Sequence, residues 1–523
     1  MQVCAGMNGN SLQGAAGVGH AVAHWIVKGY PPGNMLQFEV QRFTKQHNNS
    51  RFLSERAKEV VGKHYKLEYP LVSEFKHGRR IRSSTIHSEL EARGGVFGEK
   101  MGWEIALYFD PYHHREDPPA ELPQGSFKKP EFIDHVEDEY HVCREGVGLI
   151  DMSSFAKFIV KGETASVISY LQRLCSNDVN IPVGGIIPTG MQNEGGGYEN
   201  DCLLVRRDDN SFFMVSPTQQ QTRILEWMEN HLPEDNSVGL QDVTSMYTVL
   251  SLAGPKSKDL MEELSGESMS MHPFTYKEVN VGYASGVMVM AVTNTGEPGY
   301  SLYIPSEFAL QIYDNLMKVG RDYGIRNVGQ LAMRFLRIEK FIPFWAEELS
   351  AVTTPNEVNR TFKVKFDKES FIGKEALIKQ RNEGVTKRLV QLHLDDTTEE
   401  GFDKDEDVWP WGGESVYRNG EFVGSVTSSA YGFTLHKMVC LGFIQHPSTL
   451  RGERTPVETS WIGDKTAAWT IDIAGKMVPV TVHLHPPKMP IISQDGAAAD
   501  FKPKRNSLNV QLVKHHKREQ KSV

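Results

Sequence analysis

Cysteine is scarce in this sequence, and no two cysteines have a metal-binding spacing. The 523 residues include 5 cysteines, which are odd in number and far apart: Cys4, Cys143, Cys175, Cys202 and Cys440. This pattern is typical of free thiols in a reducing compartment. It argues against a disulfide framework and against a cysteine-ligated metal site.

Long apolar runs and a basic excess are also missing. No uninterrupted apolar stretch approaches the roughly 18 residues that a membrane-spanning helix needs. The 57 Lys and Arg residues are outnumbered by 66 Asp and Glu, which gives a net charge of -9. Nucleic-acid-binding proteins usually carry a basic excess on one domain, so nucleic acid is not an expected partner. The opening MQVCAGMNGNS has no basic segment followed by an apolar one, so no targeting peptide is visible.

The chain is too long for one compact core, and its strands and helices are intermixed with hairpins. That mixture predicts an α+β fold rather than a doubly wound sheet. Residues 95–109 read as a turn and a strand, and the proline-rich DPYHHREDPPAELPQG that follows reads as a linker. The expected units are residues 1–50, 51–125, 126–385 and 386–490, with a polar basic tail at 491–523 that we expect to be disordered.

A glycine-rich segment near the start lacks the full dinucleotide-binding pattern. Gly14, Gly17 and Gly19 do not have the GxGxxG spacing, and no strand precedes them. A loop of small residues that leads into a helix ending at Gly29 could contact an anion or a dinucleotide. It could equally allow a helix to pack closely on a sheet, so at most it is part of a cofactor site.

Periodicity predicts several local elements. Ala165, Ile168, Leu171 and Leu174 recur at helical spacing, which predicts a helix that buries this face. Residues 279–292 read as two strands around a glycine turn.

Two further elements follow the same reasoning. Ser306 is a plausible N-cap for the helix that follows it. Asn419-Gly420 between alternating segments is a strong hairpin signal, and residues 386–490 as a whole predict a small β-barrel or sandwich.

The stretch GGGYENDCLL, residues 195–204, carries the first candidate for chemistry. Three glycines allow a tight reversal, and Asp201 lies a few residues into the returning strand. A carboxylate at the mouth of a buried strand would be desolvated, which raises its pKa and suits acid–base work. Alternatively, Asp201 binds the backbone amides of its own turn.

Two more stretches offer candidate pocket residues. In VTNTGEPGYSLYIP, Glu297 lies between two glycines and could grip N–H groups of a heterocyclic ligand, or face solvent. In RFLRIEKFIPFW, charged residues including Arg337 alternate with large apolar ones. That pattern suits a pocket wall and also an ordinary amphipathic helix.

These stretches, in this order, resemble the aminomethyltransferase family, the T-protein of glycine cleavage. GLIDMSSFAKFIVKG, NEGGGYENDCLLV, TNTGEPGYSLYIP, LRIEKF, KESFIGKEAL and GSVTSSAYG carry the resemblance. The N-terminal stretches CAGMNGNSLQGAAGVGHAVAHWIVKG and GGVFGEKMGWEIALYF resemble dimethylglycine and sarcosine dehydrogenases, at the end of the flavin domain and in the central domain. The resemblance implies an N-terminally shortened form: a flavin-domain remnant, a central domain, a folate-binding domain and a C-terminal barrel.

The resemblance also implies roles for residues. Asp201 matches the catalytic or folate-orienting acid, and Glu297, Tyr300 and Arg337 match folate-pocket residues, so tetrahydrofolate is a possible cofactor. FAD is not expected, because its dinucleotide-binding strand would precede residue 1, and Gly14, Gly17 and Gly19 would keep only a partial flavin contact. The sequence departs from the family pattern at five positions: Asn200, Ser301, Phe341, Val358 and Arg360. We expect the larger side chains to change the pocket wall, because packed sites tolerate added volume poorly.

Within this group the resemblance extends to a regulatory branch in the mitochondrial matrix. It implies a non-catalytic subunit that modulates the phosphatase acting on pyruvate dehydrogenase and changes its response to divalent cations. The catalytic subunit of that phosphatase would be the partner, and the pyruvate dehydrogenase complex would be reached indirectly. The alternatives are a folate-dependent aminomethyltransferase or demethylase that uses Asp201, and an unstable product whose N-terminal segment, up to about residue 110, is proteolysed early.

Overall fold

The computed structural model describes residues 3–64, 66–71, 75–113, 125–492 and 498–500. The predicted linker falls largely, and the predicted tail almost entirely, outside these residues. The N-terminal part is helical: α1 (Ser11–Lys28), α2 (Ser50–Lys63) and α3 (His87–Glu91), with 3-10 turns η1 (Val40–Arg42) and η2 (Lys45–His47).

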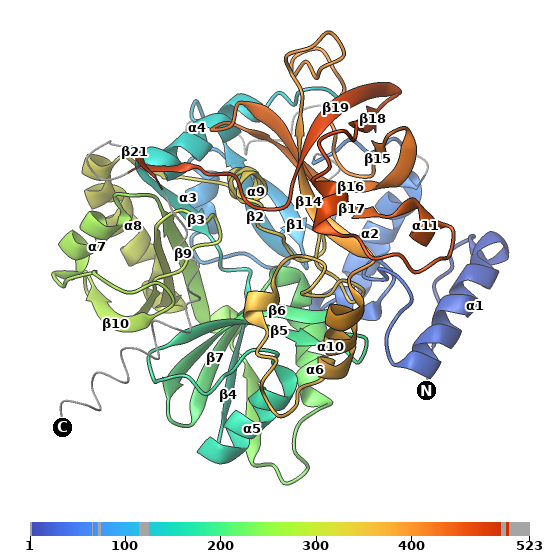
Figure 1. Cartoon of the computed structure of the whole chain (residues 1–523). Helices are drawn as coiled ribbons and strands as arrows, with labels where there is room; N and C mark the ends of the chain where they lie inside the picture. The colour runs from blue at the N-terminus through green and yellow to red at the C-terminus, as the bar shows by residue number, and fades with distance from the viewer. Residues whose placement is uncertain (1–2, 65, 72–74, 114–124, 493–497, 501–523) are drawn as a thin grey trace.

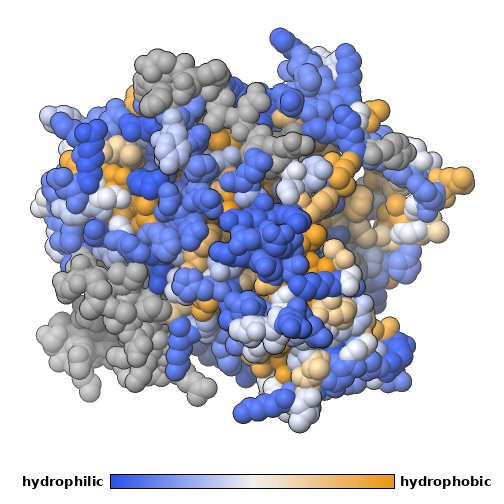
Figure 2. Space-filling view, turned by 90° about the horizontal axis from the view of Figure 1, so that it is seen from above, coloured by the Kyte–Doolittle hydropathy of each residue, from blue (hydrophilic) through white to orange (hydrophobic). Residues whose placement is uncertain are grey.

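Helix α1 projects from the body of the molecule at the right of Figure 1, and Ala21 is its one buried residue. The predicted end is confirmed: Gly29 adopts φ 83° and its N–H bonds to the carbonyl of Trp25. The three glycines expected in a loop before the helix lie inside it, because the helix already begins at Ser11. In Figure 2 the face seen from above is mostly hydrophilic, and orange groups appear at the right-hand edge, the side on which α1 lies in Figure 1.

Residues 95–109 form a hairpin, which corrects the expectation of a turn followed by one strand. β1 (Gly95–Lys100) pairs with β2 (Trp103–Phe109), and the turn residues Met101 and Gly102 both have positive φ. Every residue of β2 is buried.

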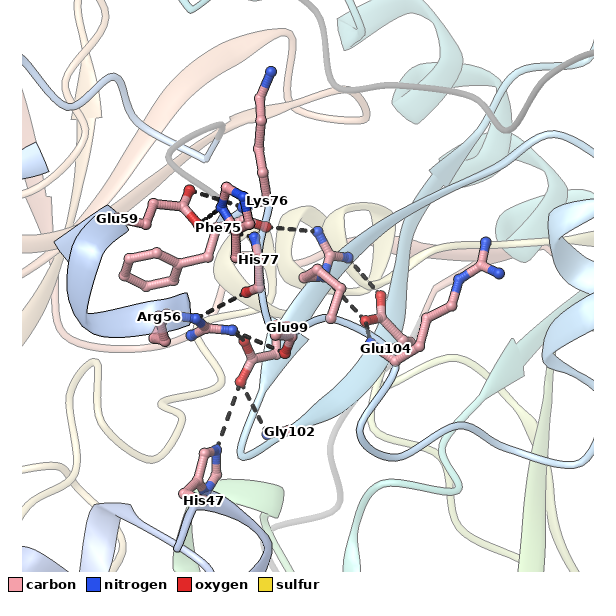
Figure 3. A network of polar contacts seen from close by, with 12 residues as sticks. His47, Arg56, Glu59, Phe75, Lys76, His77, Glu99, Gly102 and Glu104 are labelled. Atoms are coloured by element: carbon pink, nitrogen blue, oxygen red, sulfur yellow. Dashed lines mark hydrogen bonds and ion pairs between the residues drawn. The ribbon is translucent and has the colours of Figure 1, made fainter. Parts of the chain in front are cut away.

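A polar network ties the N-terminal helices to this hairpin (Figure 3). The Arg56 guanidinium lies 2.5 Å from the Glu99 carboxylate on β1, and it also donates to the carbonyl of His77. Arg79 pairs at 2.5 Å with Glu104 on β2. Glu59 on α2 accepts the backbone N–H of His77 at 2.8 Å. Arg56 on α2 and the segment around His77 and Arg79 are therefore fastened to the hairpin by ion pairs and hydrogen bonds.

A six-stranded sheet has the order β10-β11-β12-β9-β3-β13, with β13 parallel to β3 and the other pairs antiparallel. Its strands are β3 (Val147–Asp151), β9 (Tyr247–Ala253), β10 (Tyr276–Val281), β11 (Ala284–Met290), β12 (Gly299–Pro305) and β13 (Ile325–Asn327). Helices α7 (Ser257–Ser265) and α8 (Ala309–Val319) share one buried apolar cluster with it, at the left of Figure 1. The two predicted strands at 279–292 are confirmed as β10 and β11. Ser306 is not the cap of α8, because it begins a 3-10 turn (η5, Ser306–Phe308) and donates to the carbonyl of Ser245.

A five-stranded antiparallel sheet has the order β5-β6-β7-β4-β8. Its strands are β4 (Ala156–Gly162), β5 (Ile186–Gln192), β6 (Tyr198–Asp208), β7 (Ser211–Ser216) and β8 (Val238–Asp242), and it lies with α5 (Thr164–Leu174) and α6 (Gln221–Glu229) at the bottom of Figure 1. The predicted face of α5 is confirmed at Leu171 and Leu174, and Ile168 is half-buried. The prediction is wrong at Ala165, which is exposed; Val167 and Tyr170 complete the buried face.

The C-terminal domain is a closed six-stranded barrel with the order β14-β17-β16-β15-β18-β19, as expected from the sequence. Its strands are β14 (Lys387–Leu394), β15 (Ser415–Arg418), β16 (Glu421–Gly432), β17 (Lys437–Gln445), β18 (Trp469–Ile473) and β19 (Lys476–His483), and its short helices are α11 (Pro447–Leu450) and α12 (Thr459–Ile462). β20 (Pro490–Ile492) and β21 (Ala498–Asp500) form a separate two-stranded sheet, with β21 at the left of Figure 1. Asn419 and Gly420 form the predicted hairpin turn with φ 53° and 80°.

Helix α9 (Gln330–Glu339) lies in the middle of Figure 1 and α4 (Ile133–Glu145) near its top, and one apolar cluster joins both to β2, both sheets and the barrel. The fully buried Glu139 on α4 accepts the N–H of Phe109 at 2.7 Å and that of Gly329 at 2.8 Å. Burial raises the pKa of Glu139 to about 8, against the effect of these two hydrogen bonds. The α+β fold is confirmed. Helix α10 (Lys374–Glu383) lies in the chain between the 3-10 turn η7 (Thr361–Lys363) and the first strand of the barrel.

Candidate functional site

A cavity of about 570 Å³ opens between the two sheets. Its walls come from β5 to β7, from β11 and β12, and from the segments 342–345 and 360–363. Most of its described lining is apolar or aromatic. The charged residues in that lining are Asp201, Arg360 and Lys363.

The glycine turn beside the cavity is required mainly by close packing. A Cβ on Gly197 would lie 1.8 Å from the carbonyl oxygen of Ala351, and one on Gly195 would lie 2.8 Å from the ring of Tyr30. Gly196 alone of the three adopts positive φ, at 82°. The turn therefore lets residues 350–353 rest against the start of β6.

Asp201 lies on β6, opposite Gly190 of β5, and its carboxylate is held by two cations. The Nζ of Lys363 is 2.7 Å from Oδ1, and Nη1 of Arg360 is 3.2 Å from Oδ2. The side chains of Asp201, Lys363 and Arg360 are 17%, 11% and 13% exposed, so the ion pairs are largely screened from water. The hypothesis that Asp201 binds the amides of its own turn is not supported, because both oxygens bind side chains 159 and 162 residues away.

The expected rise in the pKa of Asp201 is corrected by this geometry. Burial would raise that pKa, but the charges of Lys363 and Arg360 and the Lys363 hydrogen bond outweigh it, so the pKa lies below its usual value. Burial and the charge of Arg360 lower the pKa of Lys363 in turn, against the effect of Asp201. Asp201 is therefore a fixed anion rather than a group poised to exchange a proton near neutral pH.

Glu297 follows Gly296, which lines the cavity, but Glu297 itself is not part of the lining. Its two carboxylate oxygens accept from Nη1 of Arg144 at 2.9 Å and 3.1 Å, and Lys340 donates to Oε1 as well. Arg144 is 4% and Glu297 7% exposed. Burial shows that the alternative of a solvent-facing turn is wrong, and a ligand contact through Glu297 stays a prediction.

Tyr300 and Arg337 also make internal contacts. The hydroxyl of Tyr300 donates to the carbonyl of Met269 at 2.6 Å, and burial raises its pKa to about 12. Arg337, which is 3% exposed, pairs with Glu348 at 2.8 Å and donates to the carbonyl of Ile342 at 3.0 Å. Arg337 thus supports the wall segment 342–345 from behind. Of the four predicted folate-pocket residues, the structure places Asp201 on the cavity and the other three elsewhere.

The departures from the family pattern have different consequences. Ser301 and Arg360 line the cavity, whereas Phe341 and Val358 are not part of its described lining. Phe341 adopts φ 57°, which is unusual for a bulky residue. Asn200 is buried and donates to the Ser216 hydroxyl at 3.0 Å. The expected change in the pocket wall therefore comes from Arg360 rather than from Phe341.

Lys363 is the residue that sequence reasoning missed. It lies between Phe362 and Val364 in the 3-10 turn η7 (Thr361–Lys363), and a lysine flanked by apolar residues was the available signal. A second cavity of about 390 Å³ lies where the N-terminal segment meets α6, and Arg223 there binds both Glu39 and Glu199.

The described residues offer no metal site and no membrane-spanning helix. No group of three or more His, Cys, Asp or Glu residues in that part of the chain could hold a metal ion. No helix among the described residues is both long and apolar enough to cross a bilayer. The cysteines are unpaired; Cys4 is exposed and the other four are buried.

Folate does not fit the observed arrangement well. The resemblance assigns folate recognition to Asp201 and Glu297, but each carboxylate is already paired with two cations. The N–H groups of a pterin would then lack a free carboxylate acceptor among the described lining residues. The partial flavin contact through Gly14, Gly17 and Gly19 stays a prediction. These glycines lie in α1, and a Cβ built on any of them would have no neighbour within 4 Å.

Three family models match the chain. The GCVT N-terminal domain matches residues 86–368, the glycine cleavage T-protein C-terminal barrel domain residues 387–487, and the FAD dependent oxidoreductase central domain residues 28–84. The chain is 44% identical over 488 residues to a protein named pyruvate dehydrogenase phosphatase regulatory subunit, mitochondrial, from Mus musculus. That match covers 92% of the chain and 54% of the mouse protein.

Two further relatives are more distant. Dimethylglycine dehydrogenase, mitochondrial, from Homo sapiens is 27% identical, over 90% of the chain and 51% of that protein. The chain thus spans about half the length of these two curated relatives. Among solved structures, the glycine cleavage system aminomethyltransferase T from Bartonella henselae matches with a TM-score of 0.62 and 19% identity, covering 77% of the chain and 97% of that structure. This last likeness establishes the fold.

Proposed function

The chain belongs to the glycine cleavage T-protein family, and within this family we propose that it is a non-catalytic regulatory subunit that modulates the phosphatase acting on pyruvate dehydrogenase. The catalytic subunit of that phosphatase is its direct partner. The pyruvate dehydrogenase complex is reached through this partner, in the mitochondrial matrix.

The observation that carries the non-catalytic part of the proposal is the internal pairing of Asp201. An acid–base catalyst must reach the proton that it transfers and have a pKa near the working pH. Asp201 instead has a lowered pKa and spends both oxygens on Lys363 and Arg360. The similarity to a protein named as a regulatory subunit supports the regulatory part.

The second candidate function is a folate-dependent aminomethyltransferase or demethylase. The cavity of about 570 Å³ and the partial exposure of Asp201 favour it. In that case Asp201 would orient a reduced folate while a one-carbon unit passes to it from an amine. Asp201→Asn would then abolish methylene transfer and leave the melting temperature nearly unchanged.

The regulatory proposal is tested with purified components. The phosphatase catalytic subunit is assayed on phosphorylated pyruvate dehydrogenase over a range of Mg²⁺ concentrations, with and without this chain. We expect the chain to move the half-saturating Mg²⁺ concentration by about fivefold or more, the lower end of typical coupling between two sites. A glycine cleavage T-protein at the same concentration is the matched control, because it shares the fold and should have no effect. Superimposable Mg²⁺ curves with and without the chain would overturn the proposal.

A further inference from the structure

The cavity carries an excess of positive charge. Its charged described lining residues are one anion, Asp201, and two cations, Arg360 and Lys363. The side chains of both cations are largely buried, so water screens their charge poorly. Burial and the neighbouring Arg360 charge lower the pKa of Lys363, which means that the site would gain from a further anion.

Both cations keep hydrogen-bond donors that Asp201 does not use. An ammonium has three N–H donors and a guanidinium has five. Among the described residues, Nζ of Lys363 donates to Asp201, and the guanidinium of Arg360 donates to Asp201 and to the carbonyl of Pro343 at 3.3 Å. The remaining donors can serve a ligand that offers acceptors.

The other walls suit an apolar body. The aromatic lining residues are Phe155, Phe274, Tyr303, Phe344, Trp345 and Phe362. Phe362, next to Lys363, is 62% exposed. A cavity of about 570 Å³ falls in the range that commonly encloses a small organic ligand.

We propose that this cavity binds a small organic anion, with a carboxylate on Lys363 and Arg360 and an aromatic or aliphatic body against the apolar walls. The ligand shares the two cations with Asp201, so Asp201 is a competitor for the anion rather than its partner. This inverts the role that the family resemblance gives to the acid, since a pterin would need a free Asp201 carboxylate. The proposal does not depend on the phosphatase partner, because binding is measured on the chain alone.

The test uses two probes that differ mainly in charge. Binding of 1-naphthaleneacetate and of its neutral amide, 1-naphthaleneacetamide, to the full chain is measured by titration calorimetry. Charge-assisted hydrogen bonds are about twice as strong as neutral ones, so we expect the acid to bind about tenfold more tightly than the amide.

Three variants locate the site. Lys363→Met should weaken binding of the acid about tenfold and leave the amide nearly unaffected. Lys365→Met is the matched control, because Lys365 is 39% exposed and pairs with Asp367 outside the cavity lining. This variant should bind the acid with the affinity of the wild type. Asp201→Asn should strengthen binding of the acid, because it removes the competing carboxylate. Asp201→Asn should also increase the rise in melting temperature that the acid causes.

The outcomes are distinct. Equal affinity for acid and amide, no binding of either probe to folded protein, or weaker binding in Asp201→Asn would each overturn the proposal. Tetrahydrofolate binding that requires both Asp201 and Glu297 would overturn it as well and restore the family ligand. If the probe results hold while the Mg²⁺ curves do not move, the regulatory proposal fails and the anion site stands.

Discussion

Replacing Asp201 by asparagine separates a structural ion pair from a catalytic acid. The substitution keeps the shape of the side chain and removes its charge. The introduced amide would still accept one hydrogen bond from Lys363. The two cations, however, would face each other without a neutralising carboxylate in a poorly hydrated site.

The expected loss of stability follows from distance and burial. At 2.7 Å and an effective dielectric constant of about 20, Coulomb's law gives on the order of 6 kcal/mol for the Asp201–Lys363 pair before desolvation is subtracted. Breaking a fully buried pair costs about 3–5 kcal/mol, whereas an exposed pair contributes about 0–1 kcal/mol. With side chains 17% and 11% exposed, this pair lies between these limits, so we expect Asp201→Asn to cost about 2–3 kcal/mol.

Urea unfolding followed by tryptophan fluorescence measures this cost, since Trp345 lies in the cavity wall. In the double variant Asp201→Asn, Lys363→Met, the loss should be smaller than the sum of the single losses by about 1–2 kcal/mol. Lys365→Met should remain within about 0.5 kcal/mol of the wild type. If the free energy of unfolding of the single variant Asp201→Asn also lies within about 0.5 kcal/mol of the wild type, the ion pair does not hold Asp201, and the enzyme hypothesis gains support.

Three further predictions concern the rest of the fold. Glu139 holds its proton up to about pH 8 in the folded chain and to about pH 4.5 when unfolded, so its contribution to the free energy of unfolding is complete below pH 4.5 and is lost as pH rises toward 8. Glu139→Gln should remove this pH dependence, which amounts to on the order of a few kcal/mol. An unchanged slope of stability against pH would contradict the raised pKa. In the same urea-unfolding assay, Gly197→Ala should cost about 1–3 kcal/mol because its Cβ meets the Ala351 carbonyl, whereas Gly17→Ala on exposed α1 should gain about 0.5–1 kcal/mol; equal effects would be inconsistent with the packing described. Limited proteolysis should cut within α1 before residues 95–109, because α1 buries one residue and β2 is wholly buried; cleavage within residues 95–109 as early as within α1 would indicate that the whole N-terminal segment up to about residue 110 is unstable.

Local patterns in the sequence predicted much of the fold. The glycine turn between β5 and β6, the Asn419-Gly420 hairpin and the C-terminal barrel depend on turn chemistry and alternation, which nearby residues determine. The errors arose where distant contacts decide. Ala165 is exposed because the sheet and the rest of the domain select a different face of α5, and the hairpin turn at Met101-Gly102 gave only a weak local signal.

The candidate site shows the same division. The position of Asp201 after the glycine turn was predictable from the sequence, but the direction of its pKa shift was not. That direction depends on Lys363 and Arg360, which are 162 and 159 residues away in the chain. Glu297 was likewise found by its turn, while its pairing with Arg144 and Lys340 depends on packing between α4 and the end of α9.

The most direct test of the account is a calorimetric titration of the purified chain with tetrahydrofolate, with Glu297→Ala beside it. The account holds that both acids of the family pocket are engaged internally, so it predicts that any heat from tetrahydrofolate, which itself carries carboxylates, is the same for the wild-type chain and for Glu297→Ala. Binding near micromolar affinity, roughly -8 kcal/mol, that disappears in Glu297→Ala would contradict the account and identify a working folate site.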